Sequence, residues 1–200
     1  MKKFIIPIVV VVGLVLVIGI AALILIVPKY NQFVDLDEDV NSQYAQIKTQ
    51  LERRNDLIPN IVSTVQGYAD HESEIFEAVA EARTDIGNAS NVDELSEAND
   101  NMTSALSRLI ALQENYPDLK ADTQFTGLRD ELAGTENRIA VARQDYNGSV
   151  QEFNRNTRAF PGNLVAGIFG FDEKEYFEAS DESREVPEVD FNTDQDDGIE

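Results

Sequence analysis

The sequence has no cysteine, no tryptophan and a single histidine among its 200 residues. Without cysteine the chain has no disulfides, no thiolate nucleophile, no zinc–thiolate or iron–sulfur site, and no cysteine to carry a lipid anchor. A single histidine also excludes any metal site or catalytic centre that needs two imidazoles. These absences exclude several classes of metalloprotein and of covalent enzyme before any motif is considered.

Basic residues are also scarce, because 16 Lys and Arg stand against 37 Asp and Glu, a net charge of −21. A nucleic-acid binder needs a face rich in Lys and Arg to neutralise phosphates, so we expect no nucleic-acid partner. Acid excess with few lysines is typical of proteins that work in high salt, where counter-ions screen self-repulsion. We expect a halophilic archaeal source and a solvated acidic surface. A specific site for a cation or a basic partner is the alternative.

An uncharged apolar run, Ile8–Val27, covers 20 residues near the N-terminus. As a helix with a rise of about 1.5 Å per residue it is roughly 30 Å long, which matches the hydrocarbon core of a bilayer. The run is longer than the ~7–15 apolar residues of a secretory signal peptide. We therefore expect a transmembrane signal anchor over residues 1–28, with a cleaved signal peptide as the alternative.

The charges that flank this run predict its orientation. Lys2 and Lys3 precede it, whereas Lys29 is the single basic residue between the run and an acidic stretch. The positive-inside rule then predicts a single-pass protein of the cell membrane, with the N-terminus cytoplasmic and the remainder extracytoplasmic. That remainder has 14 basic and 37 acidic residues, a net charge of −23.

Four apolar stripes with helical spacing follow the predicted span, at residues 33–51, 58–86, 95–112 and 125–157. Short loops join them, and no segment alternates as a strand does. This pattern predicts an all-α fold, in which residues 29–160 form an elongated antiparallel four-helix bundle. The fourth stripe keeps coiled-coil spacing throughout. Asn147 and Asn154 lie beside this seam, where they either fix its register or are solvated amides on the helix face.

The stretch between the first two stripes is predicted to be a turn. Arg53 and Arg54 end the first stripe, Asp56 is a helix-capping residue type, and Pro59 suits the first turn of the next helix. An antiparallel bundle places this turn roughly 40 Å from the membrane, at 1.5 Å per residue. Our candidate partner-binding turn therefore consists of Arg53, Arg54, Asp56, Pro59 and Asn60.

The C-terminal part contains two unlike segments. Residues 160–171 are apolar, aromatic and rich in glycine, but too short to span a bilayer. They either fold back to close the open end of the bundle or contact the membrane. We define residues 161–178 as a membrane-proximal segment and residues 179–200 as an acidic disordered tail. The candidate membrane contacts are Phe160, Leu164, Ile168, Phe169 and Phe171.

No catalytic constellation is present in the sequence. His71 lies among acidic residues and has no second imidazole or thiol to complete a metal site. Glu74, Glu77 and Glu81 have helical spacing and suit a hard cation, but such sets arise by chance in so acidic a chain. The chain also lacks a Gly-rich phosphate loop and a nucleophile motif. We therefore expect no enzyme activity, no metal and no cofactor, with a carboxylate–metal hydrolase as the enzymatic alternative.

Short motifs spread in order over residues 1–178 resemble those of the LemA family. They are Tyr30–Val34, Gln50–Val62, Gly67–Glu72, Ala82-Arg83, Glu114–Lys120, Thr135–Ala140, Tyr146-Asn147 and Phe160-Pro161. This resemblance implies a membrane-anchored helical bundle without an established activity. It also implies envelope partners through gene neighbourhood alone, namely an HtpX-type membrane protease or a TPM-domain protein.

Together these observations predict a LemA-like, non-enzymatic scaffold or adaptor that is anchored at the cell envelope. The alternative is a structural protein that binds or shapes the lipid bilayer through residues 160–171, either as a single chain or as a homo-oligomer.

Overall fold

The computed structural model describes the backbone of residues 2–178 and the side chains of residues 12–14, 16–17, 19–20 and 23–178. Within this range the chain is helical and contains no strand, which confirms the all-α class. The elements are α1 (Lys2–Gln66), α2 (Ser73–Asn88), α3 (Val92–Ala111), the 3₁₀ helix η1 (Leu112–Glu114), α4 (Pro117–Ala121), α5 (Thr123–Arg158) and α6 (Gly162–Phe169). The predicted acidic tail, 179–200, lies outside the described residues.

Helix α1 is 65 residues long, which corresponds to roughly 98 Å at 1.5 Å per residue. It joins the predicted span, the first predicted helix and the start of the second in one element, and Pro28 does not interrupt it. Among the side chains that the structure describes, no helix offers a stretch long and apolar enough to cross a membrane. Residues 8–11, 15, 18, 21 and 22 of the predicted span lie outside that set.

The predicted turn at Arg53–Asn60 is wrong, because this stretch lies inside α1. The chain reverses later, at residues 67–72, where α1 has ended and α2 has not begun. Gly67 is the first glycine after the predicted span, and the amides of Tyr68 and Ala69 both donate to the carbonyl of Val65 to close the helix.

Burial explains why α1 continues through Pro59. A proline inside a helix removes one backbone hydrogen bond and costs about 3 kcal/mol or more. The neighbouring side chains of Ile58, Ile61 and Val65 are almost completely buried. Each contributes about 1.5–3 kcal/mol through removal of apolar surface from water, and the three contributions together exceed the cost of the proline.

Side chains cap the N-terminal ends of α3 and α5. Asn91 Oδ1 accepts a hydrogen bond of 2.8 Å from the amide of Glu94, and the Glu94 carboxylate accepts bonds from the amide and hydroxyl of Ser90. The bond from the Ser90 amide is the main reason that the pKa of Glu94 is lowered. Asp122 caps α5 in the same way, through the amides of Gln124 and Phe125. Short-range capping therefore sets two helix starts.

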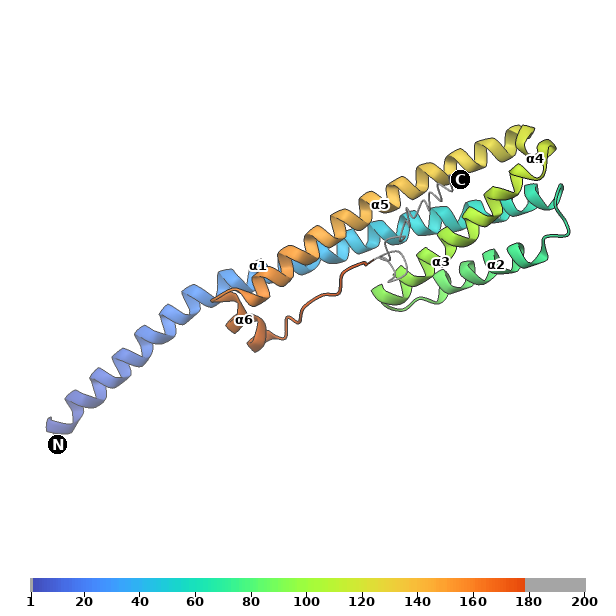
Figure 1. Ribbon diagram of the computed structural model, residues 1–200. Coiled ribbons are helices and arrows are strands. Elements are labelled where there is room, and N and C mark those ends of the chain that lie inside the picture. The colour runs from blue at the N-terminus through green and yellow to red at the C-terminus, as the bar shows by residue number, and fades with distance from the viewer. Residues whose placement is uncertain (1, 179–200) are drawn as a thin grey trace, which may run out of the picture.

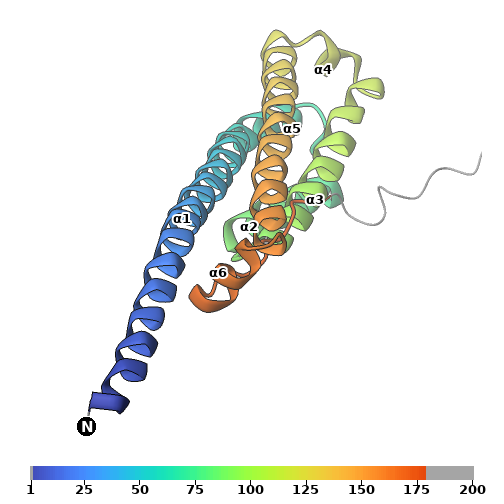
Figure 2. The ribbon, with the colours of Figure 1, turned by 90° about the vertical axis from the view of Figure 1, so that its left-hand side faces the viewer.

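The helices form a long rod in which α1 and α5 run antiparallel side by side (Figures 1 and 2). We call the end near α4 distal and the end near α6 proximal. The α2–α3 hairpin packs beside the distal part of this pair (Figure 1). The antiparallel four-helix arrangement is thus present in the distal half, whereas the proximal half consists of α1, α5, α6 and the residues that follow α6.

The hydrophobic core has two parts that follow this division. The distal part centres on Ile61, Val65, Met102 and Leu109, from α1 and α3. The proximal part includes Phe33, Ile47, Tyr146, Phe153 and Phe177, from α1, α5 and the C-terminal segment. The α2–α3 hairpin contributes Leu95 to this proximal part, and α6 and the residues after it add Val165, Ala166 and Phe177.

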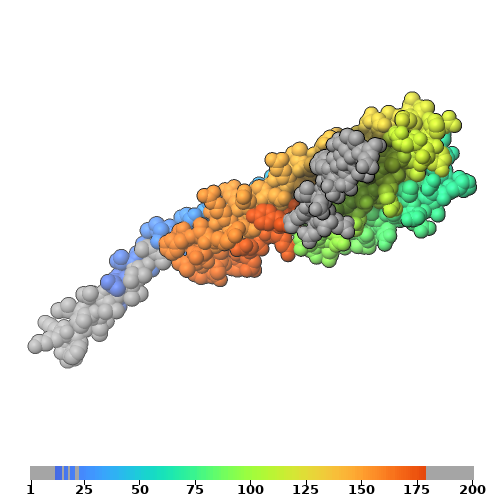
Figure 3. Space-filling model, in the orientation of Figure 1, coloured from blue at the N-terminus to red at the C-terminus, as the bar shows by residue number. Residues whose placement is uncertain are grey.

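The range 161–178 has two parts in the structure. The first is α6, which ends at Gly170 in the left-handed conformation with φ +76°. The second is an extended segment, residues 171–178, which we call the strap. It runs from α6 back along α5 toward α3 (Figures 1 and 3).

Gly162, the first residue of α6, is expected to tolerate no side chain. A Cβ atom at this position would lie 2.3 Å from the carbonyl oxygen of Asn156 and 3.3 Å from Cζ of Phe33. We expect Gly162→Ala to lower the free energy of unfolding by about 1–3 kcal/mol, the usual cost of overpacking. Gly167→Ala is the matched control, because a Cβ there meets nothing within 4 Å. Urea unfolding followed by circular dichroism measures both, and an equal effect of the two substitutions would contradict the prediction.

Candidate functional site

The residues of the predicted partner-binding turn are divided between surface and core. Arg53 is exposed, and its Nη2 lies 3.0 Å from Oε1 of Glu131 on α5. Asp56, Pro59 and Asn60 are also exposed, on the distal part of α1. These four residues remain accessible, although they belong to a helix rather than to a turn.

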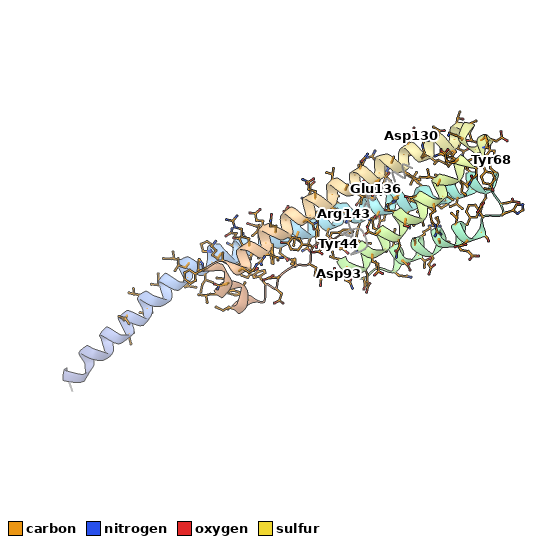
Figure 4. All side chains as sticks on the ribbon, viewed as in Figure 1. Tyr44, Tyr68, Asp93, Asp130, Glu136 and Arg143 are labelled. Atoms are coloured by element: carbon orange, nitrogen blue, oxygen red, sulfur yellow. The ribbon has the colours of Figure 1, made fainter. Side chains whose placement is uncertain are left out.

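Arg54, in contrast, is 3% exposed. Its Nη1 lies 2.8 Å from Oε2 of Glu136 on α5 and donates to Oδ1 of Asn99 at 3.1 Å, and its Nη2 donates to Oγ1 of Thr103. Burial lowers the pKa of Arg54, while the charges of Glu136 and Asp100 act in the opposite direction. Glu136 and Arg143 lie at mid-length of the rod (Figure 4). Arg54 therefore joins α1, α3 and α5 from inside the bundle and is not available to a partner.

A groove between α1 and α2 lies beside the exposed residues of the distal end. Its volume is about 560 Å³, and its lining includes Pro59 and Val62 from α1 and Phe76, Val79 and Arg83 from α2. Of these lining residues only Pro59 was predicted to contact a partner, because the predicted turn placed the two helices differently.

The proximal end exposes apolar side chains on one face of α6 and at Phe160, two residues before the helix begins. Phe160 is 80% exposed, and Leu164, Ile168 and Phe169 are also exposed. The opposite face of α6 is buried through Gly162, Val165 and Ala166. One face of α6 therefore closes the end of the bundle, which is one of the two expected roles, and the other face is exposed to solvent.

Phe171, the fifth predicted membrane contact, belongs to an aromatic cluster instead. Its ring stacks on Phe33 with centroids 5.1 Å apart, and Phe153 contacts both rings edge-on. Tyr30 continues the cluster toward Phe169, at 4.9 Å between centroids. The cluster fastens α6 to the α1–α5 pair.

Charge is distributed unevenly around this end. Residues 1–34 and 153–171 contain no Asp or Glu, in a chain that has 37 of them. The same stretches supply Lys29, Arg155 and Arg158. The exposed apolar face of α6 thus lies in a stretch without acidic residues, which ends at Asp172 and Glu173, and Oε1 of Glu173 lies 3.6 Å from Nε of Arg158.

Asn147 and Asn154 have a role that sequence analysis did not identify. Both amides pair with main-chain atoms of the strap, at Phe177 and Lys174 respectively. The sequence signal for this role was the spacing of seven residues between the two asparagines on a regular helix. No residue near them in the sequence indicated that an extended segment lies opposite them.

The described side chains contain no arrangement typical of an enzyme. His71 is almost fully exposed, and its Nε2 lies 3.5 Å from Oδ1 of Asp70, which is also exposed. Glu74, Glu77 and Glu81 are exposed on α2. Over the part of the chain that the structure describes, no group of three or more His, Asp or Glu is arranged to hold a metal ion.

Known proteins similar to this chain share most of its length. Magnetosome protein MamQ 2 of Paramagnetospirillum magneticum is 27% identical over 176 residues, which cover 75% of this chain and 65% of that protein. Magnetosome protein MamQ of Magnetospirillum gryphiswaldense is 26% identical, with 74% and 64% covered. Protein LemA of Metamycoplasma hominis is 25% identical, with 84% and 75% covered. This chain therefore spans slightly less than two thirds of the length of the MamQ relatives.

A family model described as the LemA family matches residues 43–191. The match includes the distal groove, all of α5, the exposed face of α6 and the strap. Because it covers well over half of the sequence and agrees with the helical architecture, the chain belongs to the LemA family.

Proposed function

We propose that the protein is a membrane-anchored, non-enzymatic helical bundle that acts as a scaffold or adaptor at the cell envelope. The observation that carries the proposal is the continuity of α1 from residue 2 to residue 66. The apolar run Ile8–Val27 and the bundle belong to one helix, so a bilayer that held the run would hold the rod upright. The resemblance to membrane-anchored LemA-like proteins supports the same topology.

The topology is tested with intact cells and isolated membranes. We expect the full chain to stay in the membrane fraction after an alkaline high-salt wash. We also expect external protease to digest the bundle and to leave a short N-terminal fragment, as the cytoplasmic N-terminus of a single-pass protein requires. Release of the chain by the wash would overturn the anchor, and protection of the bundle in intact cells would overturn the orientation.

For the adaptor role, the distal groove is the surface that the proposal assigns to an envelope partner. Pro59 in its lining is exposed, as is Asn60, the next residue of α1, and Val62 and Phe76 add apolar side chains to the lining. An HtpX-type protease or a TPM-domain protein is the candidate partner through family association alone.

A photo-crosslinking amino acid in place of Asn60 tests this surface in cells. We expect one discrete adduct with an envelope protein from position 60. The same amino acid in place of Gln144, which is exposed on α5 away from the groove, is the control and is expected to give none. Equal adducts from both positions, or none from position 60, would count against a partner at the distal groove.

The alternative function is direct contact of the proximal end with the bilayer surface. It is favoured by the acid-free sequence around α6 and by its exposed apolar face, since apolar and aromatic side chains on an amphipathic helix enter the lipid interface. The basic residues Arg155 and Arg158 suit anionic headgroups at the same level.

The absence of tryptophan makes this alternative directly measurable. In the full chain reconstituted into vesicles with brominated lipids, we expect the fluorescence of Phe160→Trp to be quenched. Val141→Trp is the matched control, because Val141 is similarly exposed but lies near the middle of α5. Its emission is expected to be unaffected by the bromines. Equal quenching at both positions, or none at position 160, would exclude contact through α6.

We further propose that the acid excess outside the first 28 residues is an adaptation to high salt in a halophilic archaeon. Support comes from the composition alone, namely 37 acidic residues and only six lysines in the whole chain.

A further inference from the structure

The strap is bound to the rest of the molecule mainly through its own main chain. Asn154 Nδ2 donates to the carbonyl of Lys174 at 2.8 Å, and the amide of Lys174 donates to Asn154 Oδ1 at 2.8 Å. Asn147 makes the same pair of bonds with Phe177, at 3.0 and 2.8 Å. Each asparagine thus satisfies both main-chain groups of one strap residue, as a neighbouring strand does in a sheet.

The distance between the two asparagines along α5 nearly equals the distance between their two partner residues along the extended strap. Asn147 and Asn154 are seven residues apart, which is about 10.5 Å along a helix with a rise of 1.5 Å. Lys174 and Phe177 are three residues apart, which is about 10 Å in an extended chain with a rise of ~3.3 Å. The strap therefore lies antiparallel to α5 in a fixed register.

Two further carbonyl groups of the strap are bound by side chains of the bundle. The hydroxyl of Tyr146 donates to the carbonyl of Glu175 at 2.9 Å, and the hydroxyl of Ser96 on α3 donates to the carbonyl of Glu178. Six main-chain atoms within five consecutive residues are thus recognised. Contacts of this kind provide affinity for any extended chain, while side-chain pockets provide selectivity.

The side chains of the strap supply that selectivity at both ends. Phe177 is 1% exposed and its ring lies 4.8 Å from the guanidinium of Arg143. Phe171 stacks in the aromatic cluster. Between them, Lys174 Nζ lies 2.6 Å from Oδ1 of Asp37 on α1. The groove accepts an extended peptide with two aromatic residues six positions apart and a base midway.

We propose that this groove on α5 and α3 is an exchangeable peptide-binding site, and that it also binds the strap of a second copy of the same chain. A second copy presents the same main-chain atoms, the same two phenylalanines and the same lysine. The contacts made in trans are therefore those already seen in cis, which is the condition for exchange of an element between protomers.

The connection to α6 is suited to such an exchange. Gly170 joins α6 to the strap, is exposed, and has a positive φ that glycine adopts without strain. A Cβ at this position would meet nothing within 4 Å, so the surroundings do not enclose the connection. Beyond Phe171, hydrogen bonds and ion pairs connect the strap to α1, α3 and α5, so these contacts can form whichever copy supplies α6.

Two complementary variants of the full chain test the exchange in detergent. Phe177→Ala weakens the strap but keeps the groove, and Asn147→Leu/Asn154→Leu removes the groove but keeps the strap. With different tags, the two variants are expected to co-purify when mixed, because one donates a strap and the other accepts it. The control is a mixture of two differently tagged samples of the same variant. We expect at least about tenfold more co-purification from the mixture of the two variants than from this control, which corresponds to a difference of ~1.4 kcal/mol or more in the free energy of association.

A peptide-binding experiment tests the groove independently of the second copy. We expect a fluorescent peptide of residues 169–178 to bind Phe177→Ala at least about tenfold more tightly than the unaltered chain, whose own strap competes at high effective concentration. Circular dichroism establishes that each variant is folded. If the double leucine variant is not, Asn147→Ser replaces it, with the same expected direction.

The outcomes are decisive in each direction. Failure of the peptide to bind Phe177→Ala would overturn the peptide-binding site itself. Peptide binding without co-purification of the mixed variants would overturn the second copy as its occupant. Both failures leave the membrane anchor and the distal groove unaffected, because neither variant alters α1 or α2.

Discussion

Glu136→Ala is expected to lower the free energy of unfolding by about 3 kcal/mol, because it leaves the buried charge of Arg54 without its nearest counter-ion. The guanidinium lies 2.8 Å from Glu136 and is enclosed by α1, α3 and α5. Asn99 and Thr103 still accept its hydrogen bonds after the substitution, but neither carries a charge, and Asp100 is then the remaining one of the two carboxylates that raise the pKa of Arg54. Chemical unfolding of the full chain in detergent, followed by circular dichroism, measures the loss.

The neighbouring arginine provides a matched control. Glu131→Ala removes the partner of Arg53, and the two side chains of this pair are 55% and 43% exposed. Exposed pairs of this kind contribute about 0–1 kcal/mol. Removal of the carboxylate that pairs with Arg54 is thus expected to cost severalfold more stability than removal of the one that pairs with Arg53, although the two arginines are adjacent on one helix. If the two substitutions had equal effects, Arg54 would not depend on Glu136 as the structure indicates.

Phe153→Ala is expected to cost about 3–5 kcal/mol, the range for truncation of a buried aromatic side chain. Phe153 is completely buried on α5, contacts the rings of Phe33 and Phe171, and lies under Lys174 Nζ at 5.3 Å. Its loss removes packing from α1, α6 and the strap together. Beyond the fall in stability, we therefore expect faster hydrogen exchange at the amides of Lys174 and Phe177.

Phe160→Ala is the control for this prediction. The side chain of Phe160 is 80% exposed, so its truncation is expected to change stability by less than about 0.5 kcal/mol. Protection of the strap amides is expected to be unchanged. Unaltered exchange of those amides in Phe153→Ala would show that the aromatic cluster does not hold the strap.

Short-range patterns predicted most of the helical content correctly. The stripes at 95–112 and 125–157, and the coiled-coil spacing of the second of these, all depend on residues within a few positions of one another, and they correspond to α3 and α5. The turn at Arg53–Asn60 failed for the complementary reason. Its signals are also local, but the burial of Ile58 and Ile61 by other helices outweighs them.

The candidate sites depended more strongly on long-range contacts. For residues 160–171 the sequence left closure of the bundle end and membrane contact open, and the structure shows that α6 has one buried and one exposed face. Arg54 was assigned to the surface, because only the packing of α3 and α5 shows where its charge is compensated. Asn147 and Asn154 are spaced regularly on one face of a helix, but their partner could not be predicted, because the strap lies 20–30 residues away in the sequence.

The sequence by itself determined the helical class, the exclusion of thiol and two-histidine chemistry, the position of the most apolar segments and the concentration of acid outside them. These properties follow from composition and from the 3.6-residue period, which each segment carries alone. Only the tertiary structure decided that α1 continues past Pro59, that Arg54 is internal and that two asparagines bind an extended segment. Each of these is a balance between a local cost and burial or hydrogen bonding supplied by a distant element, and that balance exists only in the folded chain.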